Sequence, residues 1–170
     1  MTRLIALTLA LFALPVTMTA QEAITSRNWR THPEIREVRA IVASIEDRLP
    51  AMTETSDSSD CGRGYTAIVA HLFADSAGLV RKYIREEGSD DSAGEESFYY
   101  DPLGTLRFTF ASVGAVNGTH REDRYYYGAK GQLLYHDKRL LAGPGYSGRG
   151  DTPVVNPKED FTALCGAPPQ

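Results

Sequence analysis

This sequence contains few cysteines and has no excess of basic residues. Its 170 residues include two cysteines, Cys61 and Cys165, and 18 Lys or Arg against 22 Asp or Glu, a net charge of −4. Two cysteines without CxxC or His-rich spacing are too few for a zinc site. A mildly acidic chain also lacks the basic footprint of proteins that bind nucleic acid or anionic lipid. We therefore expect no metal, no cofactor and no nucleic-acid partner.

A long apolar run occurs once, at the start of the chain. Residues 4–14 are apolar or small, Arg3 precedes them, and Pro15 and the small residue Ala20 follow. This pattern is typical of a secretory signal peptide, here residues 1–20, and the run is shorter than the ~20 residues that span a bilayer. We expect residues 21–170 to form a single domain that is periplasmic or secreted, without membrane insertion.

The two cysteines are predicted to form one disulfide. An even cysteine count in an exported chain favours a bridge over free thiols. Joining Cys61 to Cys165 closes a loop of about a hundred residues, which restricts the unfolded chain. The bridge would tie the beginning of the predicted sheet to the C-terminal tail.

Residues 33–49 are predicted to form a helix. Thr31 and Glu34 have the spacing of a capping box, and Pro33 fits the first turn. The apolar residues recur at three- and four-residue intervals along one face, namely Ile35, Val38, Ile41, Val42, Ile45 and Leu49. Residues 50–60 are polar and acidic, which indicates a flexible linker.

A short motif recurs three times, at offsets of 26 and 27 residues, in FADSAGLVRKY, YYDPLGTLRFT and YYGAKGQLLYH. The copies begin at Phe73, Tyr99 and Tyr126. In the second copy, residues 101–104 read Asp-Pro-Leu-Gly, the preferred composition of a type I turn, with a glycine that tolerates positive φ. The repeat therefore predicts three hairpin tips.

Between the second and third tips, Asn117-Gly118 is a strong hairpin signal. If Asn117 and Gly118 form a two-residue turn, the numbers of any two residues opposite each other in the hairpin add up to 235. Phe108 then faces Tyr127, and Phe110 faces Tyr125. The prediction is an α+β fold. It consists of an antiparallel β-meander of about six strands over residues 65–140, one N-terminal helix packed on one face, and an irregular tail, residues 141–170, in which residues 158–164 could form a short helix.

The segment YYDPLGTL resembles the Y-D-x-x-G-x-L core of YD-type β-hairpin repeat proteins of bacterial surfaces and secretions. The resemblance covers about ten residues in each of three units. This chain departs from it in its longer period, its few repeats and Gly128 in place of Asp. The resemblance implies a scaffold role for the repeats. The layout of helix and aromatic sheet is also similar to that of small secreted inhibitors of β-lactamases or lysozymes.

Two motifs are candidates for chemistry. Residues 143–148, GPGYSG, match G-x-G-x-x-G, but no helix can begin soon after them, as a dinucleotide site requires. His120, Glu122 and the nearby arginines of THREDR could serve a small nuclease-like hydrolase. The mild acidity of the chain argues against a cleft for a phosphodiester, so this hydrolase is an alternative to the main hypothesis.

The tyrosines provide the main hypothesis. Seven of the nine lie between residues 99 and 146. Adjacent strand residues point to opposite faces, so some rings must lie on a face that the helix leaves uncovered. Tyr99, Tyr126, Tyr127 and Arg107 are predicted to form a binding face, or else an aromatic ladder that stabilises the sheet. We expect a non-enzymatic domain that binds a protein or envelope component; a structural envelope protein is a further alternative.

Overall fold

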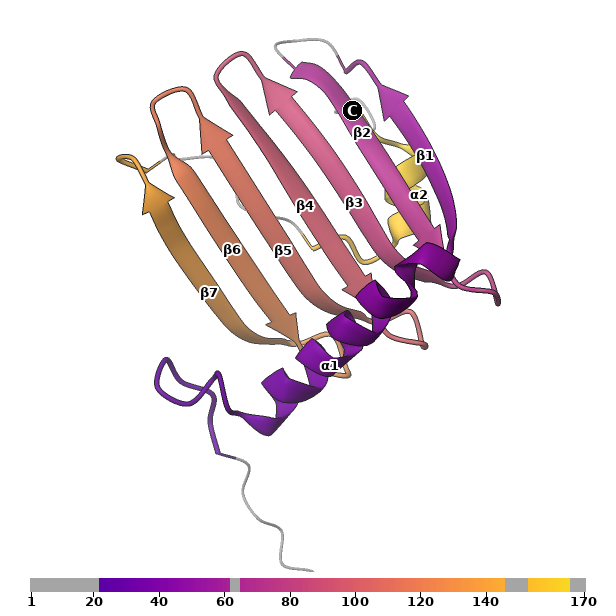
Figure 1. Cartoon of the computed structure of the whole chain (residues 1–170), viewed down its shortest axis with the longest axis vertical. Helices are drawn as coiled ribbons and strands as arrows, with labels where there is room; N and C mark the ends of the chain where they lie inside the picture. The colour runs from indigo at the N-terminus through magenta and orange to yellow at the C-terminus, as the bar shows by residue number, and fades with distance from the viewer. Residues whose placement is uncertain (1–21, 62–64, 146–152, 166–170) are drawn as a thin grey trace, which may run out of the picture.

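The computed structural model describes residues 22–61, 65–145 and 153–165, so the signal peptide expected at residues 1–20 lies outside them. The helical segments are α1 (Pro33–Arg48), the 3₁₀ turn η1 (Leu49–Ala51) and α2 (Pro157–Thr162). The strands are β1 (Thr53–Ser59), β2 (Tyr65–Ala74), β3 (Val80–Ser89), β4 (Ser92–Tyr100), β5 (Leu106–Ala115), β6 (His120–Tyr127) and β7 (Leu133–Ala142). They form one antiparallel sheet whose strand order follows the chain (Figure 1).

The predicted α+β meander with an N-terminal helix is confirmed, with seven strands rather than about six. The additional strand, β1, occupies the segment that we expected to be a flexible linker. Its residues, TETSDSS, are almost all exposed and show no apolar alternation. Pairing along its whole length, from Thr53 with Ala74 to Ser59 with Ile68, holds it in the sheet. Tertiary pairing thus overrides weak strand propensity.

Helix α1 follows the predicted apolar spacing. Ile35, Val38 and Ile45 are fully buried. The predicted capping box with Thr31 as the N-cap is wrong, because the N-cap residue is His32, whose side chain makes no capping hydrogen bond. The Thr31 hydroxyl instead donates to the Asn28 carbonyl oxygen, in a turn that precedes the helix.

The three hairpin tips are confirmed, and they share one geometry. At the second tip, the Gly104 amide donates to the Asp101 carbonyl oxygen at 2.9 Å, and the Asp101 amide donates to the Thr105 carbonyl oxygen at 3.0 Å. Gly104 has φ +78°, in the left-handed region that favours glycine. This is a type I turn followed by a glycine bulge, the usual three-residue hairpin loop.

The Asn117-Gly118 turn adopts this same longer loop, which corrects the predicted register. The Gly118 amide donates to the Ala115 carbonyl oxygen, and Gly118 has φ +82°. The numbers of paired residues therefore add up to 234, one less than the 235 expected for a two-residue turn. Phe108 pairs with Tyr126, and Phe110 with Arg124. Because strand side chains alternate between faces, this shift by one also moves Tyr126 to the face of Phe108.

Different segments cover the two faces of the sheet (Figure 1). Helix α1 crosses one face, here the helix face, near the three hairpin tips. Residues 153–165, here the strap, lie on the other, the strap face. The central helix-face row comprises Lys82, Tyr99, Phe108, Tyr126 and Tyr135. The corresponding strap-face row comprises Leu72, Tyr83, Phe98, Thr109 and Tyr125.

Each face has its own buried apolar cluster. On the helix face, the cluster contains Trp29, Ile35, Val38 and Tyr126. On the strap face, the larger cluster contains Ile68, Ala70, Leu72, Val80, Tyr83, Phe98, Tyr100, Leu106, Tyr127 and Leu164. The single sheet is thus the middle layer of the molecule, and it shares core residues with both covers.

The predicted disulfide is confirmed. Cys61 and Cys165 are bonded, with Cα atoms 5.2 Å apart and 104 residues of separation. A disulfide of this kind is typical of an oxidising compartment. Within the described ranges, no helix is long and apolar enough to cross a membrane.

Candidate functional site

The four residues predicted to form an aromatic binding face are all buried. Tyr99, Tyr126, Tyr127 and Arg107 are each at most 7% exposed. Tyr127 belongs to the strap-face cluster, whereas Tyr126 packs in the helix-face cluster. The sheet therefore does not present these four side chains together to a partner. Helix α1 lies over Tyr99, Tyr126 and Arg107, which sequence reasoning placed on an uncovered face.

Polar bonds hold α1 against the buried tyrosines. The Tyr99 hydroxyl donates to Glu46 Oε1 at 2.7 Å, and Lys82 Nζ lies 2.8 Å from the same oxygen. Burial opposes ionisation of Glu46, but the hydrogen bonds from Lys82 and Tyr99 and the charge of Lys82 outweigh it. The pKa of Glu46 is therefore below its ordinary value. Burial, then the bond to Glu46, raises the pKa of Tyr99.

Aromatic stacking continues this contact toward β7. The Trp29 ring stacks on Tyr135 at a centroid distance of 5.0 Å and lies 5.7 Å from Tyr126. The Phe108 and Tyr126 rings are 5.0 Å apart. These contacts match the aromatic ladder that we considered as the alternative to a binding face, because each ring stabilises the sheet or its contact with the helical segment.

Of the residues of the hydrolase alternative, His120, Glu122 and Arg124 lie on the helix face, away from α1, whereas Arg121 lies on the strap face. His120 is exposed, and its Nε2 lies 3.3 Å from Ser112 Oγ. Glu122 forms an ion pair with Arg124 at 2.7 Å. General acid–base catalysis needs a tuned pair positioned around a substrate. The contacts of His120 and Glu122 are to Ser112 and Arg124, and they do not form such a pair with each other in the described part of the chain.

Beyond α1, the helix face carries a polar surface that we call the open patch. The paired strands place its members in two adjacent rows, namely Ile84, Phe110 and Arg124 in one, and Glu86, Glu95, Ser112 and Glu122 in the other. Glu86 and Glu95 are exposed, and the other members are half-buried.

Charge is balanced on one side of the open patch and unbalanced on the other. On β6, Glu122 pairs with Arg124, whose guanidinium lies 4.9 Å from the Phe110 ring centre. On β3 and β4, Glu86 and Glu95 are directly opposite each other. Within the part of the chain that the structure describes, neither carboxylate has a cationic partner, and Glu95 accepts one hydrogen bond, from Ser97 Oγ at 3.2 Å.

Sequence reasoning missed this acidic pair, although a signal for it exists. Residues 89–92 read Ser-Asp-Asp-Ser, a turn composition. If the chain folds back at Asp90 and Asp91, the numbers of paired residues add up to 181. That register places Glu86 opposite Glu95, as observed.

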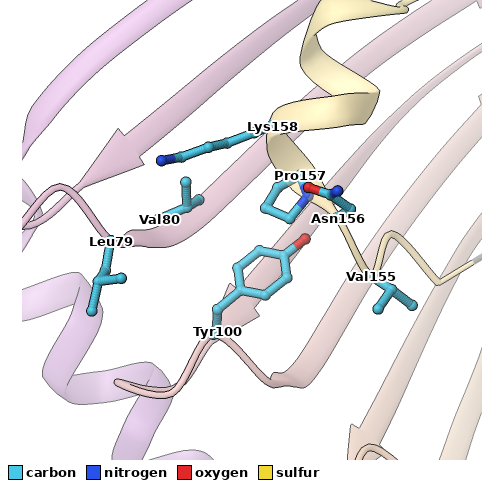
Figure 2. A pocket seen from close by; sticks show the side chains of 8 residues that line it. Leu79, Val80, Tyr100, Val155, Asn156, Pro157 and Lys158 are labelled. Carbon is cyan, nitrogen blue, oxygen red and sulfur yellow. The ribbon is translucent and has the colours of Figure 1, made fainter.

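A small open pocket lies elsewhere, between the hairpin tips and the strap. Its volume is about 200 Å³. Figure 2 shows the Tyr100 ring pointing from the sheet toward Asn156 and Pro157 of the strap. The lining is mainly apolar, with Leu79 and Val155 at its rim. Among the described residues, no three His, Cys, Asp or Glu side chains are grouped closely enough to hold a metal ion.

No protein-family model, curated protein or solved structure matches this chain.

Proposed function

We propose that this protein is a periplasmic or secreted, non-enzymatic binding domain that docks a basic protein partner on the open patch. One observation carries the proposal. Glu86 and Glu95 face each other on a stretch of sheet that α1 leaves uncovered. The proposal keeps the predicted role for an exposed sheet face but moves it from the buried tyrosines to these carboxylates.

The acidic pair is unfavourable for folding. Like charges directly opposite each other destabilise an antiparallel pair. Features that conflict with local stability are concentrated at functional sites. A guanidinium or ammonium group from a partner would relieve the repulsion between Glu86 and Glu95 and form charge-assisted hydrogen bonds with them.

Apolar surface beside the acidic pair supports protein binding over capture of a small cation. Ile84 and Phe110 lie in the adjacent row and are half-buried. Protein interfaces combine such an apolar centre with a polar rim, and their affinity is concentrated in a few anchoring contacts. The disulfide supports an oxidising compartment, consistent with the expected signal peptide.

The first test is a binding measurement with matched charge variants. The protein carrying Glu86→Gln and Glu95→Gln is compared with one carrying Asp47→Asn and Asp57→Asn, which makes the same change in net charge at exposed sites on α1 and β1. A partner isolated from envelope extract on the wild-type protein is titrated against each. We expect at least tenfold weaker binding to the Glu86/Glu95 variant, and near-wild-type binding to the control. Equal binding by both variants would refute the docking site.

The second test needs no partner. Removing the like-charge repulsion should raise the free energy of unfolding of the Glu86→Gln, Glu95→Gln variant by about 0.5 kcal/mol. Urea denaturation at low ionic strength measures this gain, and added salt should reduce it. A loss of stability would mean that the carboxylates already have favourable interactions within the chain.

A further inference from the structure

The strap packs on the sheet without adding a strand, as α1 does on the other face, but the strap is also tied down by the disulfide. Residues 153–165 add no strand to the sheet within the described chain, and they lie across the strap face. Leu164 is 5% exposed within the strap-face cluster, and Val154 and Phe161 pack against that cluster. The strap therefore covers apolar sheet residues without joining the backbone hydrogen bonding of the sheet.

A few polar contacts add to this apolar packing. The Tyr83 hydroxyl donates to Asp160 Oδ2 at 2.7 Å, and the Tyr100 hydroxyl donates to the Val154 carbonyl oxygen at 2.8 Å. Arg85 Nη1 lies 3.5 Å from Asp160 Oδ1. Asp160 is thus the polar anchor of the strap.

The strap has little structure that could hold it in place by itself. Helix α2 has six residues, well below the length at which an isolated helix is stable in water. The disulfide joins the strap's last residue, Cys165, to Cys61, between β1 and β2. This bond keeps the strap at a high effective concentration over the strap face. Cys165 is exposed, so a reductant can reach the bond.

We propose that the Cys61–Cys165 disulfide is a redox latch, and that its reduction releases the strap and uncovers an apolar docking surface on the strap face. The reductant is a dithiol. Its first thiolate attacks one sulfur of the latch to give a mixed disulfide, and its second thiol closes its own disulfide. The two latch sulfurs leave as thiols, so that two electrons and two protons pass to the protein.

The rest of the fold does not depend on the latch. Seven strands pair through their own backbones, and α1 packs on the opposite face through a separate cluster that contains Trp29, Ile35 and Val38. Release of the strap exposes Tyr83, Phe98 and their apolar neighbours. The occupant that fits this surface is a segment with the chemistry of the strap: apolar side chains with one carboxylate in reach of Tyr83 and Arg85.

Hydrogen exchange tests the release directly. Amide exchange is compared between the oxidised protein and the protein reduced by a dithiol under native conditions. We expect the Asp160 and Ala163 amides, which form hydrogen bonds within the strap, to exchange at least tenfold faster after reduction. Amides of β3–β5 should keep their protection. Unchanged exchange in the strap, or an equal loss of protection in the sheet, would overturn the proposal.

A peptide added in trans tests the uncovered surface. The probe is a labelled peptide of residues 153–165 with Cys165→Ser. It should bind the reduced protein and a full-length Cys165→Ser variant, and it should bind the oxidised wild type at least tenfold more weakly. Equal binding to the oxidised and reduced proteins would overturn the latch.

Two altered peptides distinguish specific docking on the strap face from nonspecific hydrophobic binding. The peptide with Asp160→Asn loses the charge facing Arg85 and should bind about tenfold more weakly to the reduced protein. The control peptide carries Glu159→Gln, at a side chain that contacts Asn156 within the strap, and should bind as the unaltered probe does. Equal weakening by both substitutions would contradict the assigned role of Asp160.

Discussion

The first two hairpin tips and the third form the same turn with different side chains. At the second tip, Asp101 Oδ1 accepts hydrogen bonds from the Leu103 and Thr105 amides, while Oδ2 lies 3.3 Å from Arg107 Nη1. The first tip repeats this arrangement with Asp75 and Arg81. The third tip has Gly128 and Leu134 at the equivalent positions, so both members of the ion pair are missing together.

A second contact of the arginine explains why the aspartate and the arginine occur together at the first two tips and are both absent from the third. Arg81 Nε donates to the Tyr100 carbonyl oxygen at 3.2 Å, and Arg107 Nε donates to the Tyr127 carbonyl oxygen at the same distance. Each arginine therefore joins its own tip to the residue that precedes the next tip. The third tip has no successor in the described sheet, and Leu134 packs instead against the cluster that contains Trp29.

At the third tip, a different residue supports the turn. Gln132 Oε1 accepts a hydrogen bond from the Lys130 amide at 3.2 Å, which replaces one of the bonds that Asp makes at the other tips. A Cβ atom at Gly128 would overlap the Gln132 side chain. Gly128 and Gln132 therefore form a matched pair: the glycine leaves the space that the Gln132 side chain occupies. The third tip is thus a variant of the repeat suited to the end of the described array, as terminal repeats often are.

The largest expected effect is that of removing Asp101. Asp101→Ala leaves the buried Arg107 with Glu37 as its remaining carboxylate partner, and it frees two turn amides. Loss of one member of a buried ion pair of this kind should lower the free energy of unfolding by about 3 kcal/mol. Chemical denaturation measures the loss.

The equivalent change at the first tip is the control. Asp75→Ala should cost less than Asp101→Ala, because the Asp75 side chain is 24% exposed against 6% for Asp101. An equal or larger loss at Asp75 would mean that burial does not set the strength of these bridges.

Glycine substitutions should affect all three tips alike. Gly78, Gly104 and Gly131 have φ between +75° and +78°, and no atom lies within 4 Å of the position that a Cβ atom would occupy at any of them. Alanine at each position therefore introduces backbone strain alone, which should lower stability by about 1–2 kcal/mol. Thermal melts of the three variants should shift by similar amounts. A much smaller shift at Gly131 would show that the third tip has a different backbone preference.

Gln132→Ala should have a smaller effect, because the lost hydrogen bond is exposed. We expect a decrease of about 0.5 kcal/mol in the free energy of unfolding. In the Gln132→Ala background, a further Gly128→Ala change should be tolerated better than in the wild type, since the overlapping side chain is gone. A double-mutant cycle measures this coupling, and strict additivity would contradict the matched pair.

The smallest effect concerns pH. Burial raises the pKa of Asp75, but hydrogen bonds from the Leu79 and Ala77 amides and the bond and charge of Arg81 outweigh it. The pKa of Asp75 is therefore below its ordinary value. The stabilisation that follows is present above the unfolded pKa and is lost as pH falls through the folded pKa. The stability difference between wild type and Asp75→Asn should thus shrink below about pH 4. A constant difference would rule out this linkage.

Local chemistry made the turns predictable from sequence. Aspartate, proline and glycine favour one loop conformation whatever surrounds them, and Gly104 has the predicted positive φ. The helix was predictable for a similar reason, whereas the disulfide was predictable from the cysteine count and the expected export of the chain. Register was harder, because Asn117-Gly118 is compatible with both a two-residue and a three-residue loop, and a change of one residue moves Tyr126 to the other face.

The sequence did not show which aromatic side chains are buried beneath the helix. The tyrosine count shows that rings lie on both faces, but not where a helix of 16 residues crosses a wider sheet. Tyr99 and Tyr126 lie beneath α1, whereas Phe110, two residues from Phe108 on the same face, is half-buried in the open patch. The arginine bridges were detectable, since Arg81 and Arg107 keep the 26-residue offset of the repeat.

The strand order has a consequence for how the protein folds. Each strand after the first pairs with the strand that immediately precedes it in the chain, so every step in building the sheet closes a short loop. A chain that emerges N-terminus first can therefore add one hairpin at a time. The Cys61–Cys165 bond spans 104 residues, and it can form only after the last strand has emerged. Oxidation can thus follow the assembly of the sheet, and the bond marks a sheet whose seven described strands are all available for pairing.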